Sequence, residues 1–304
     1  MLRIGMVDLD TSHPAAWIKV IRELNMDADV VAVYDSGTIY DKGYAKKFAA
    51  ENKVEKACDS LEEMMDIVDV AFIQGCNWDT HVERARLFIE AGKGVLLDKP
   101  MVGNLKDLNT ILEWHARGHK IIGGSSLRYG YEVKDFKKKL QKDEKILSVF
   151  ASTSFDVFNY ACHSVEMVGA LLKKGARYVD YLGSNVTDIF RIVYDSGVQV
   201  ILQEKCPTHH FFITVTTDKG IYPILVDAGN VYKALLEQAI PYFQGRENEL
   251  PPFDELAESI KILLCCKKAM ETGRRAFLEH LSESDEGFDG TLFAKEYKRK
   301  KFGG

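Results

Sequence analysis

The segment 91–100 carries the clearest chemical signal in the sequence. An apolar run at 95–97 predicts a buried strand, and Asp98 and Lys99 follow at its carboxyl end. Pro100 then stops the strand. Open α/β sheets bind their ligands at this end of their strands, so the acid and the lysine are candidates for contact with a ligand.

The first predicted turn is unusual for such a sheet. It follows a strand at 2–7, where a dinucleotide-binding fold has three glycines that let the backbone approach a pyrophosphate. Asp8, Asp10 and His13 stand at those positions. A like-charged pair about 4 Å apart costs on the order of 4 kcal/mol at an effective dielectric near 20. Both carboxylates would therefore repel a diphosphate unless they point away from it.

Two arrangements of this turn stay open. In the favoured one, Asp10 points away and caps a helix that begins near Pro14. Thr11, Ser12 and the helix N-terminus then receive the phosphates. In the other, the pocket binds no dinucleotide and the residues at the three glycine positions serve another ligand. A divalent metal is a weak variant of this second arrangement, and no metal is expected.

Asp35 follows the predicted strand 30–34 and precedes Ser36 and Gly37. An acid at the end of the second strand bonds the ribose hydroxyls of adenosine. Its charge would repel a 2′-phosphate, which favours NAD over NADP. The same residue could instead begin a turn with Ser36 and Gly37.

The elements that must position these residues alternate through residues 1–123. Apolar runs predict strands at 2–7, 30–34, 70–74, 95–97 and 121–122. Amphipathic stretches predict helices at 15–24, 44–51, 80–91 and 105–116. Because the strands are apolar on both faces, they predict a parallel sheet covered by helices on each side. Residues 1–123 are therefore expected to form a Rossmann-like, doubly wound α/β domain.

The pattern changes after residue 123. Longer strands rich in β-branched and aromatic residues are predicted at 146–155, 189–194, 198–203 and 211–217, with a hairpin turn at 195–197. Helices are predicted at 160–172, 231–243 and 254–272. Residues 124–304 are therefore expected to form an α+β domain with a largely antiparallel open sheet, which would bind substrate and mediate oligomerisation.

Composition narrows the function classes. A chain of 304 residues with a formal charge of −5 predicts two globular domains and argues against nucleic acid or an anionic membrane as a partner. The six cysteines show no metal or C-x-x-C spacing, and no segment reads as a signal peptide or membrane helix, so we expect a cytoplasmic protein. The basic tail at 295–301 is interpreted as a solvated end.

The first 125 or so residues resemble the Gfo/Idh/MocA family of NAD(P)-dependent oxidoreductases, which act on sugars, inositols and related polyols. In that family a strand ends in Glu-Lys-Pro, and its lysine lies at the substrate and the nicotinamide. Asp98, Lys99 and Pro100 match, with aspartate in place of glutamate. Asn77 and His81 match an Asn and a His of the preceding loop and helix. Matches after residue 125 are weak.

The resemblance also implies a catalytic histidine, His163, on a helix of the second domain. Family members commonly have an aspartate four residues before it and another three after; Asn159 and Glu166 stand there. His163 would take the hydroxyl proton as hydride leaves the carbon, while Lys99 holds the same oxygen. A helix-face histidine bonded to a neighbouring backbone group is the alternative.

The implied function is hydride transfer between a small polyhydroxylated substrate and NAD. Two other functions stay open: a non-catalytic dinucleotide- or sugar-binding regulator, and a redox-neutral lyase or glycosidase that holds NAD tightly. By analogy with the fold, the open sheet face suggests a homo-oligomer. The catalytic candidates are Lys99 and His163, and the cofactor-binding candidates are Asp10, Thr11, Ser12, His13, Asp35, Asn77, His81 and Asp98.

Overall fold

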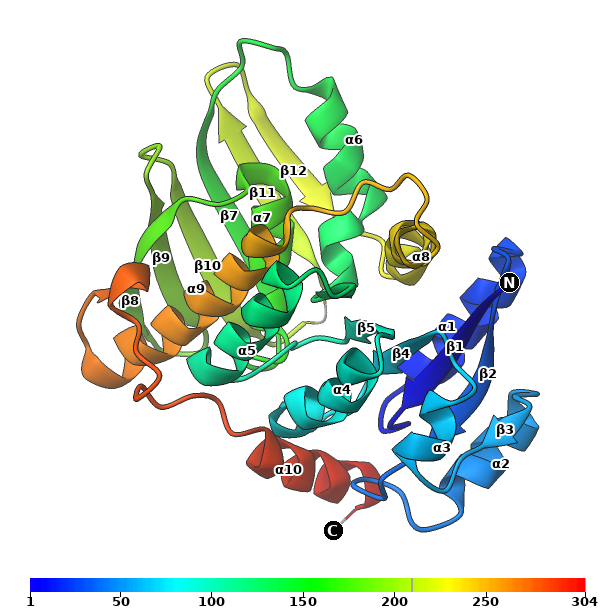
Figure 1. The fold of residues 1–304 in the computed structure, drawn as a ribbon. Coiled ribbons are helices and arrows are strands. Elements are labelled where there is room, and N and C mark those ends of the chain that lie inside the picture. Colours follow the sequence, from blue (N-terminus) through cyan, green and yellow to red (C-terminus); the bar gives the residue numbers. More distant parts are fainter. Residues whose placement is uncertain (209, 304) are drawn as a thin grey trace.

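The structure, a computed structural model, describes residues 1–208 and 210–303 and contains two sheets (Figure 1). The first sheet has six parallel strands in the order β3-β2-β1-β4-β5-β6. This order reverses between β1 and β4, as in doubly wound dinucleotide-binding folds. The strands are β1 (Leu2–Val7), β2 (Ala28–Tyr34), β3 (Lys56–Ala57), β4 (Val70–Ile73), β5 (Gly94–Leu97) and β6 (Ile121–Gly123).

Helices cover both faces of this sheet, which confirms the predicted Rossmann-like architecture. All residues of β4 and β5 are buried, as expected for central parallel strands. The short β3 and α3 were not predicted from the sequence. The helices of this part are α1 (His13–Leu24), α2 (Tyr44–Glu51), α3 (Leu61–Met65), η1 (Trp78–Thr80), α4 (His81–Glu90) and α5 (Leu105–Ala116).

The second sheet has seven strands in the order β12-β11-β7-β10-β9-β8-β13. β7 and β10 pair in parallel and the other neighbours are antiparallel, which confirms a largely antiparallel sheet. The predicted hairpin joins β9 to β10, and Gly197 takes the left-handed backbone (φ 84°) that its turn requires. The strands are β7 (Ile146–Ser154), β8 (Ala176–Ser184), β9 (Asp188–Tyr194), β10 (Gln199–Cys206), β11 (Phe212–Thr217), β12 (Ile221–Leu225) and β13 (Ala276–Phe277).

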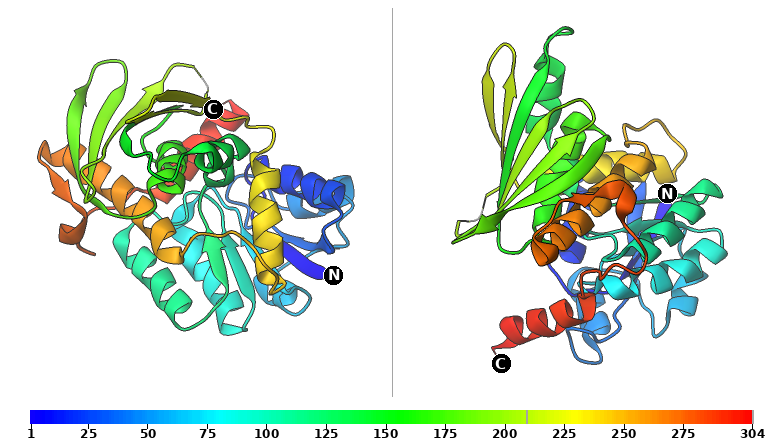
Figure 2. Two further views of the ribbon diagram at one scale, coloured as in Figure 1. Left: turned by 90° about the horizontal axis from the view of Figure 1, so that it is seen from above. Right: turned by 90° about the vertical axis from the view of Figure 1, so that its left-hand side faces the viewer.

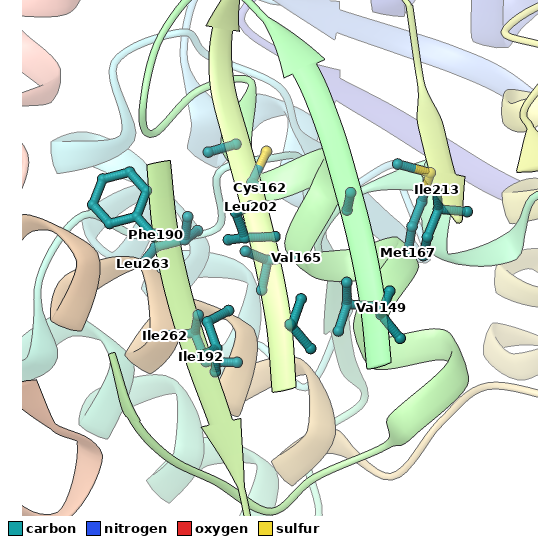
Figure 3. Close-up of a cluster of buried hydrophobic side chains, with 14 of the residues drawn as sticks. Val149, Cys162, Val165, Met167, Phe190, Ile192, Leu202, Ile213, Ile262 and Leu263 are labelled. Carbon is teal, nitrogen blue, oxygen red and sulfur yellow. The ribbon is translucent and has the colours of Figure 1, made fainter. Parts of the chain in front are cut away.

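One face of the second sheet packs on helices α7 (Ala161–Leu172) and α9 (Phe253–Thr272) (Figure 3). Side chains alternate along β9, with every second residue buried and the others half-exposed, so the opposite face of the sheet stays open. The shorter elements of this part are η2 (Ser126–Tyr129), α6 (Tyr131–Lys139) and η3 (Leu278–His280). The core in Figure 3 includes Val149, Cys162, Val165, Met167, Phe190, Ile192, Leu202, Ile213, Ile262 and Leu263.

Three helices from the second half of the chain return to the first sheet (Figure 2). α8 (Val231–Phe243) buries its apolar face in the core of the first sheet, where the Phe243 ring lies over Gly94. A Cβ on Gly94 would lie 2.6 Å from that ring, so this approach requires glycine. α9 contributes to the cores of both halves.

α10 (Gly290–Phe302) runs below α4 in Figure 1, against the loops that follow β1, β2 and β4. The basic tail is therefore a helix that packs through its apolar residues, while most of its basic side chains are exposed as the interpretation of a solvated end requires. Within the described part of the chain, no helix is long and apolar enough to cross a membrane.

Candidate functional site

A cavity of about 300 Å³ opens at the carboxyl ends of β1, β4 and β5. Both halves of the chain build it: the start of α1 and the β5 end come from the first half, and residues 155–160 and α10 come from the second. This edge is where open α/β sheets bind ligands. Five of the residues singled out from the sequence line this cavity together: Thr11, Ser12, His13, Asp98 and Lys99.

Lys99 joins the two halves inside this cavity. Its Nζ donates to Asn159 Oδ1 at 2.9 Å and lies 5.3 Å from the centre of the Tyr160 ring. The side chain is half-buried and lines the cavity. An ammonium held this way can donate to a hydroxyl or carbonyl oxygen of a ligand.

The two acids of the first turn point away from the cavity. Asp8 takes a left-handed backbone (φ 63°), which aspartate tolerates, and its buried carboxylate pairs with Arg84 and accepts from Ser36 N. Asp10 is also buried, and its Oδ2 accepts from Cys76 N at 2.9 Å. Neither charge therefore opposes an anion at the start of α1.

The predicted cap role of Asp10 is wrong. α1 begins at His13 with Ser12 as the preceding residue, and the Asp10 carboxylate reaches the loop after β4 instead. Burial raises the pKa of Asp10 to about 6. In the described part of the chain, no group of three or more His, Cys, Asp and Glu side chains is placed to hold a metal ion.

His13 and Asp98 form a hydrogen-bonded pair at the cavity wall, between His13 Nδ1 and Asp98 Oδ2. The other carboxylate oxygen accepts from Lys99 N at 2.7 Å. Burial alone would raise the pKa of Asp98, but the contacts with His13 and Lys99 outweigh it and hold that pKa below its usual range. Asp98 is therefore a buried carboxylate that stays ionised between two donors.

Asp35, Asn77 and His81 hold loops in place. The Asp35 carboxylate accepts from Leu9 N at 3.0 Å and Gly37 N at 2.9 Å. Asp35 therefore begins a turn, which was the alternative to its role at the ribose. Asn77 Oδ1 accepts from the backbone of Asp79 within the same loop. His81 is fully buried, and its two ring nitrogens bond the carbonyls of Met101 and Gly75.

His163 packs against the Tyr160 ring, which Lys99 also contacts. It is buried, its Nδ1 shares a 2.6 Å hydrogen bond with Ser125 Oγ, and its ring centre lies 5.5 Å from that of Tyr160. The neighbouring acid Glu166 pairs with Arg128 at 2.8 Å instead of with His163. The structure thus brings His13, rather than His163, to the same cavity wall as Lys99 among the described residues.

Sequence reasoning missed Gln74 and α10 as contributors to the cavity. Gln74 follows β4 and is 1% exposed, yet both polar atoms of its amide lack a partner among the described residues. An unpartnered buried amide costs about 1–3 kcal/mol, which marks it as a group for a ligand. The other is α10: Lys300 lines the cavity, and Lys301 Nζ donates to Asp10 O at 2.7 Å.

The strand order and the cavity at its edge define a two-part α/β protein with a dinucleotide-binding type of first sheet. The sequence model of the oxidoreductase family with an NAD-binding Rossmann fold, GFO_IDH_MocA, matches residues 4–124. Residues 4–124 are therefore similar to the NAD-binding domain of this oxidoreductase family.

Solved structures show the same fold over nearly the whole chain. A probable dehydrogenase from Thermotoga maritima has a TM-score of 0.79 at 16% identity, covering 92% of this chain and 100% of its own. Apo scyllo-inositol dehydrogenase from Lactobacillus casei has a TM-score of 0.78 at 13% identity, covering 92% and 98%. Myo-inositol dehydrogenase from Lactobacillus casei, in complex with NAD(H) and myo-inositol, has a TM-score of 0.77 at 12% identity, covering 91% and 96%.

The residues present fit the phosphate and nicotinamide end of a dinucleotide. Thr11 and Ser12 line the cavity where α1 begins, and helix N-termini favour anions. The inward turn of Asp8 and Asp10 removes the repulsion expected from the sequence. The unpartnered amide of Gln74 supplies both a donor and an acceptor in the same cavity.

Proposed function

We propose that this protein is an NAD-dependent oxidoreductase that acts on a sugar, inositol or related polyol by hydride transfer. The observation that carries the proposal is Lys99, which projects from the end of β5 into the cavity and is held there by Asn159 of the other half. The match of residues 4–124 to an oxidoreductase family supports it. A solved structure of this fold contains NAD(H) and myo-inositol, which supports the substrate class.

Each residue of the site has a role in this proposal. Lys99 donates to the substrate oxygen and orients its carbon. Thr11 and Ser12 hold the phosphates, and the fixed carboxylate of Asp35 disfavours a 2′-phosphate, so NAD is preferred to NADP. The bound nicotinamide supplies the acceptor for the hydride. The family resemblance implies an acid–base histidine, for which His163 is the candidate from the sequence.

Replacing Lys99 with Met tests the proposal, because it keeps the length of the side chain and removes its charge. We expect kcat/KM to fall roughly 10²–10³-fold in a polyol panel followed by reduced-nicotinamide absorbance. The control is Lys106→Met, at an exposed lysine on α5. No turnover of any polyol by the wild-type protein, or unchanged turnover in Lys99→Met, would contradict the proposal.

One observation favours a non-catalytic binding protein as the second candidate. α10 covers the loops where the adenosine end of a dinucleotide lies in this fold: Ala294 packs on Ile39 and Cys76, and Lys301 Nζ bonds Asp10 O. A sensor would use such a cover to report on its ligand. Calorimetry that finds tight NAD binding, together with no turnover across the panel, would favour this candidate over the enzyme.

A further inference from the structure

Two departures from the family pattern are in direct contact. His13 stands where the third glycine of the phosphate-binding turn is expected, and Asp98 stands where the strand-end motif has glutamate. The residues are 85 positions apart in the chain, and their side chains form the hydrogen-bonded pair at the cavity wall. The two substitutions therefore make up one structural feature: an imidazole and its carboxylate partner.

We infer that His13, oriented by Asp98, is the proton acceptor of this site, an inference that rests on the proposed oxidoreductase function. When the C–H bond of the substrate carbinol breaks, its hydride passes to the oxidised nicotinamide dinucleotide. The O–H bond breaks as well, its proton passes to His13 Nε2, and the C–O bond becomes a carbonyl. The positive charge that forms on the imidazole then lies against the Asp98 carboxylate.

The geometry of the His13 ring supports this role. A carboxylate at Nδ1 holds a proton on that nitrogen, which leaves Nε2 as the basic atom of the neutral ring. The ring stacks on Trp17 at 6.0 Å and meets the edge of Tyr232 at 5.1 Å, so its orientation is fixed from both sides. The side chain retains 15% exposure, and it lines the cavity.

Asp98 couples this imidazole to Lys99. One of its oxygens contacts His13, and the other accepts from the backbone N–H of Lys99 at 2.7 Å. The buried carboxylate of Asp98 thus fixes both the His13 ring and the backbone of Lys99, whose side chain would hold the substrate oxygen. Asp98 is a positioning residue in this scheme, because it acts through His13.

His163 has a different environment. Its Nδ1 shares a hydrogen bond with a hydroxyl, that of Ser125, and the acid three residues later is engaged by Arg128. A carboxylate stabilises an imidazolium better than a hydroxyl does. The other ionisable groups that face the His13 cavity or ring are Cys76, Lys99, Asp156, Tyr160, Tyr232, Glu296, Tyr297 and Lys300.

The first test measures the tautomer of His13 by nitrogen-15 nuclear magnetic resonance of the ligand-free protein. His13→Gln identifies the ring signals by their loss. We expect the proton on Nδ1 in the wild-type protein and a change of tautomer population in Asp98→Asn. A proton on Nε2 would overturn the inference, because that nitrogen could then accept no proton. This readout does not depend on turnover.

The second test compares pH–rate profiles of His13→Gln, His163→Gln and the exposed control His280→Gln. We expect His13→Gln to lower kcat roughly 10²–10⁴-fold and to remove the acidic limb of the profile, while His280→Gln changes neither. Asp98→Asn should lower kcat on the order of 10²-fold and shift that limb, with Asp98→Glu recovering part of the loss.

The outcomes separate the two proposals. A wild-type protein that oxidises no polyol defeats the proposed function, and the proton-transfer role falls with it. Wild-type turnover that persists in His13→Gln with an unchanged acidic limb defeats only the role of His13. Loss of the limb in His163→Gln alone would give that role to His163 instead.

Discussion

Two buried carboxyl groups in this chain, those of Asp98 and Glu204, differ in charge and therefore in their effect on stability. Asp98 contacts the His13 ring, accepts from the backbone N–H of Lys99 and stays ionised. Glu204, on β10, is fully buried and accepts a hydrogen bond from the Thr153 hydroxyl at 2.8 Å. Burial raises the pKa of Glu204 to about 8, because it outweighs the lowering effect of the Thr153 hydrogen bond. The folded protein thus keeps a proton on Glu204 that the unfolded chain releases at a lower pH.

This raised pKa predicts a pH-dependent gain in stability for Glu204→Gln. Because the folded-state pKa lies above the unfolded value near 4.3, the wild-type free energy of unfolding falls as pH rises from about 4 to about 8. The neutral amide avoids that loss. We expect Glu204→Gln to gain on the order of 3 kcal/mol at about pH 7 and almost nothing at about pH 4, measured by urea unfolding.

The exposed residue Glu247 provides the matched control for this experiment. Glu247→Gln removes the same charge from the same type of residue without a buried environment, so it should change the free energy of unfolding by less than about 0.5 kcal/mol at either pH. A gain for Glu204→Gln that is equal at both pH values would show that Glu204 is ionised in the folded protein.

For single residues, the sequence predicted which side chains line the cavity better than it predicted their contacts. Asp98, Lys99, Thr11, Ser12 and His13 were all singled out, because strand ends and turn positions are visible in a sequence. The bond between His13 and Asp98 was not predicted, since it depends on how α1 and β5 are placed in space. The same reason hid Gln74, a polar residue after a strand with no motif around it.

At the scale of elements, α10 has the least expected role. Its apolar residues Phe293 and Tyr297 are spaced four apart, which is a helical signal, but the lysines around them suggested a solvated tail. In the structure Ala294 is buried against Ile39 and Cys76, and Lys301 lies 4.4 Å from the centre of the Tyr40 ring. α10 therefore closes the edge of the first sheet next to the cavity.

Deleting residues 289–304 should expose the thiol of Cys76. Burial raises the pKa of this thiol, and the nearby Asp10 carboxylate raises it further, so we expect slow alkylation in the full-length chain. Without α10 the thiol gains solvent and its pKa falls, and the alkylation rate should rise at least about tenfold. Peptide mass spectrometry after timed alkylation measures this rate.

Cys58 serves as the internal control for the deletion. It is buried in the core between the first sheet and α3, away from α10, and its alkylation rate should stay unchanged. Equal acceleration at both cysteines would mean that the deletion unfolds the first sheet. No acceleration at Cys76 would mean that α10 does not cover it in solution.

Helices and strands with a clear hydrophobic periodicity were predicted from the sequence. Those that depend on contacts with distant parts of the chain were not. α8 and α9 were predicted to within a residue, because each has a continuous apolar face. β8, β12 and β13 were not predicted; β12 and β13 lie at the two edges of the second sheet, where the pattern of burial is weak. The parallel pairing of β7 with β10 also has no signal in the sequence.

At the scale of the whole molecule, the two halves share their cores. We propose 1–123 and 124–304 as the two domains, yet α8 and α9 of the second pack into the first. Lys120 Nζ donates to Phe243 O at 3.0 Å, which fixes the end of α8 beside β6. The predicted homo-oligomer stays a prediction, which the open face of the second sheet would accommodate.

This shared core predicts that residues 1–123 do not fold on their own. α8 buries Leu235, Leu236, Ile240 and Phe243 against the first sheet, and each large apolar side chain contributes about 1.5–3 kcal/mol. Their sum is comparable to the roughly 5–15 kcal/mol that stabilises a typical folded protein. We expect the 1–123 fragment to show no cooperative thermal transition by circular dichroism, and its co-expression with 124–304 to yield a folded complex. A fragment that melts cooperatively by itself would show that its own helices suffice, and α8 would then be a docked element whose loss leaves the first sheet intact.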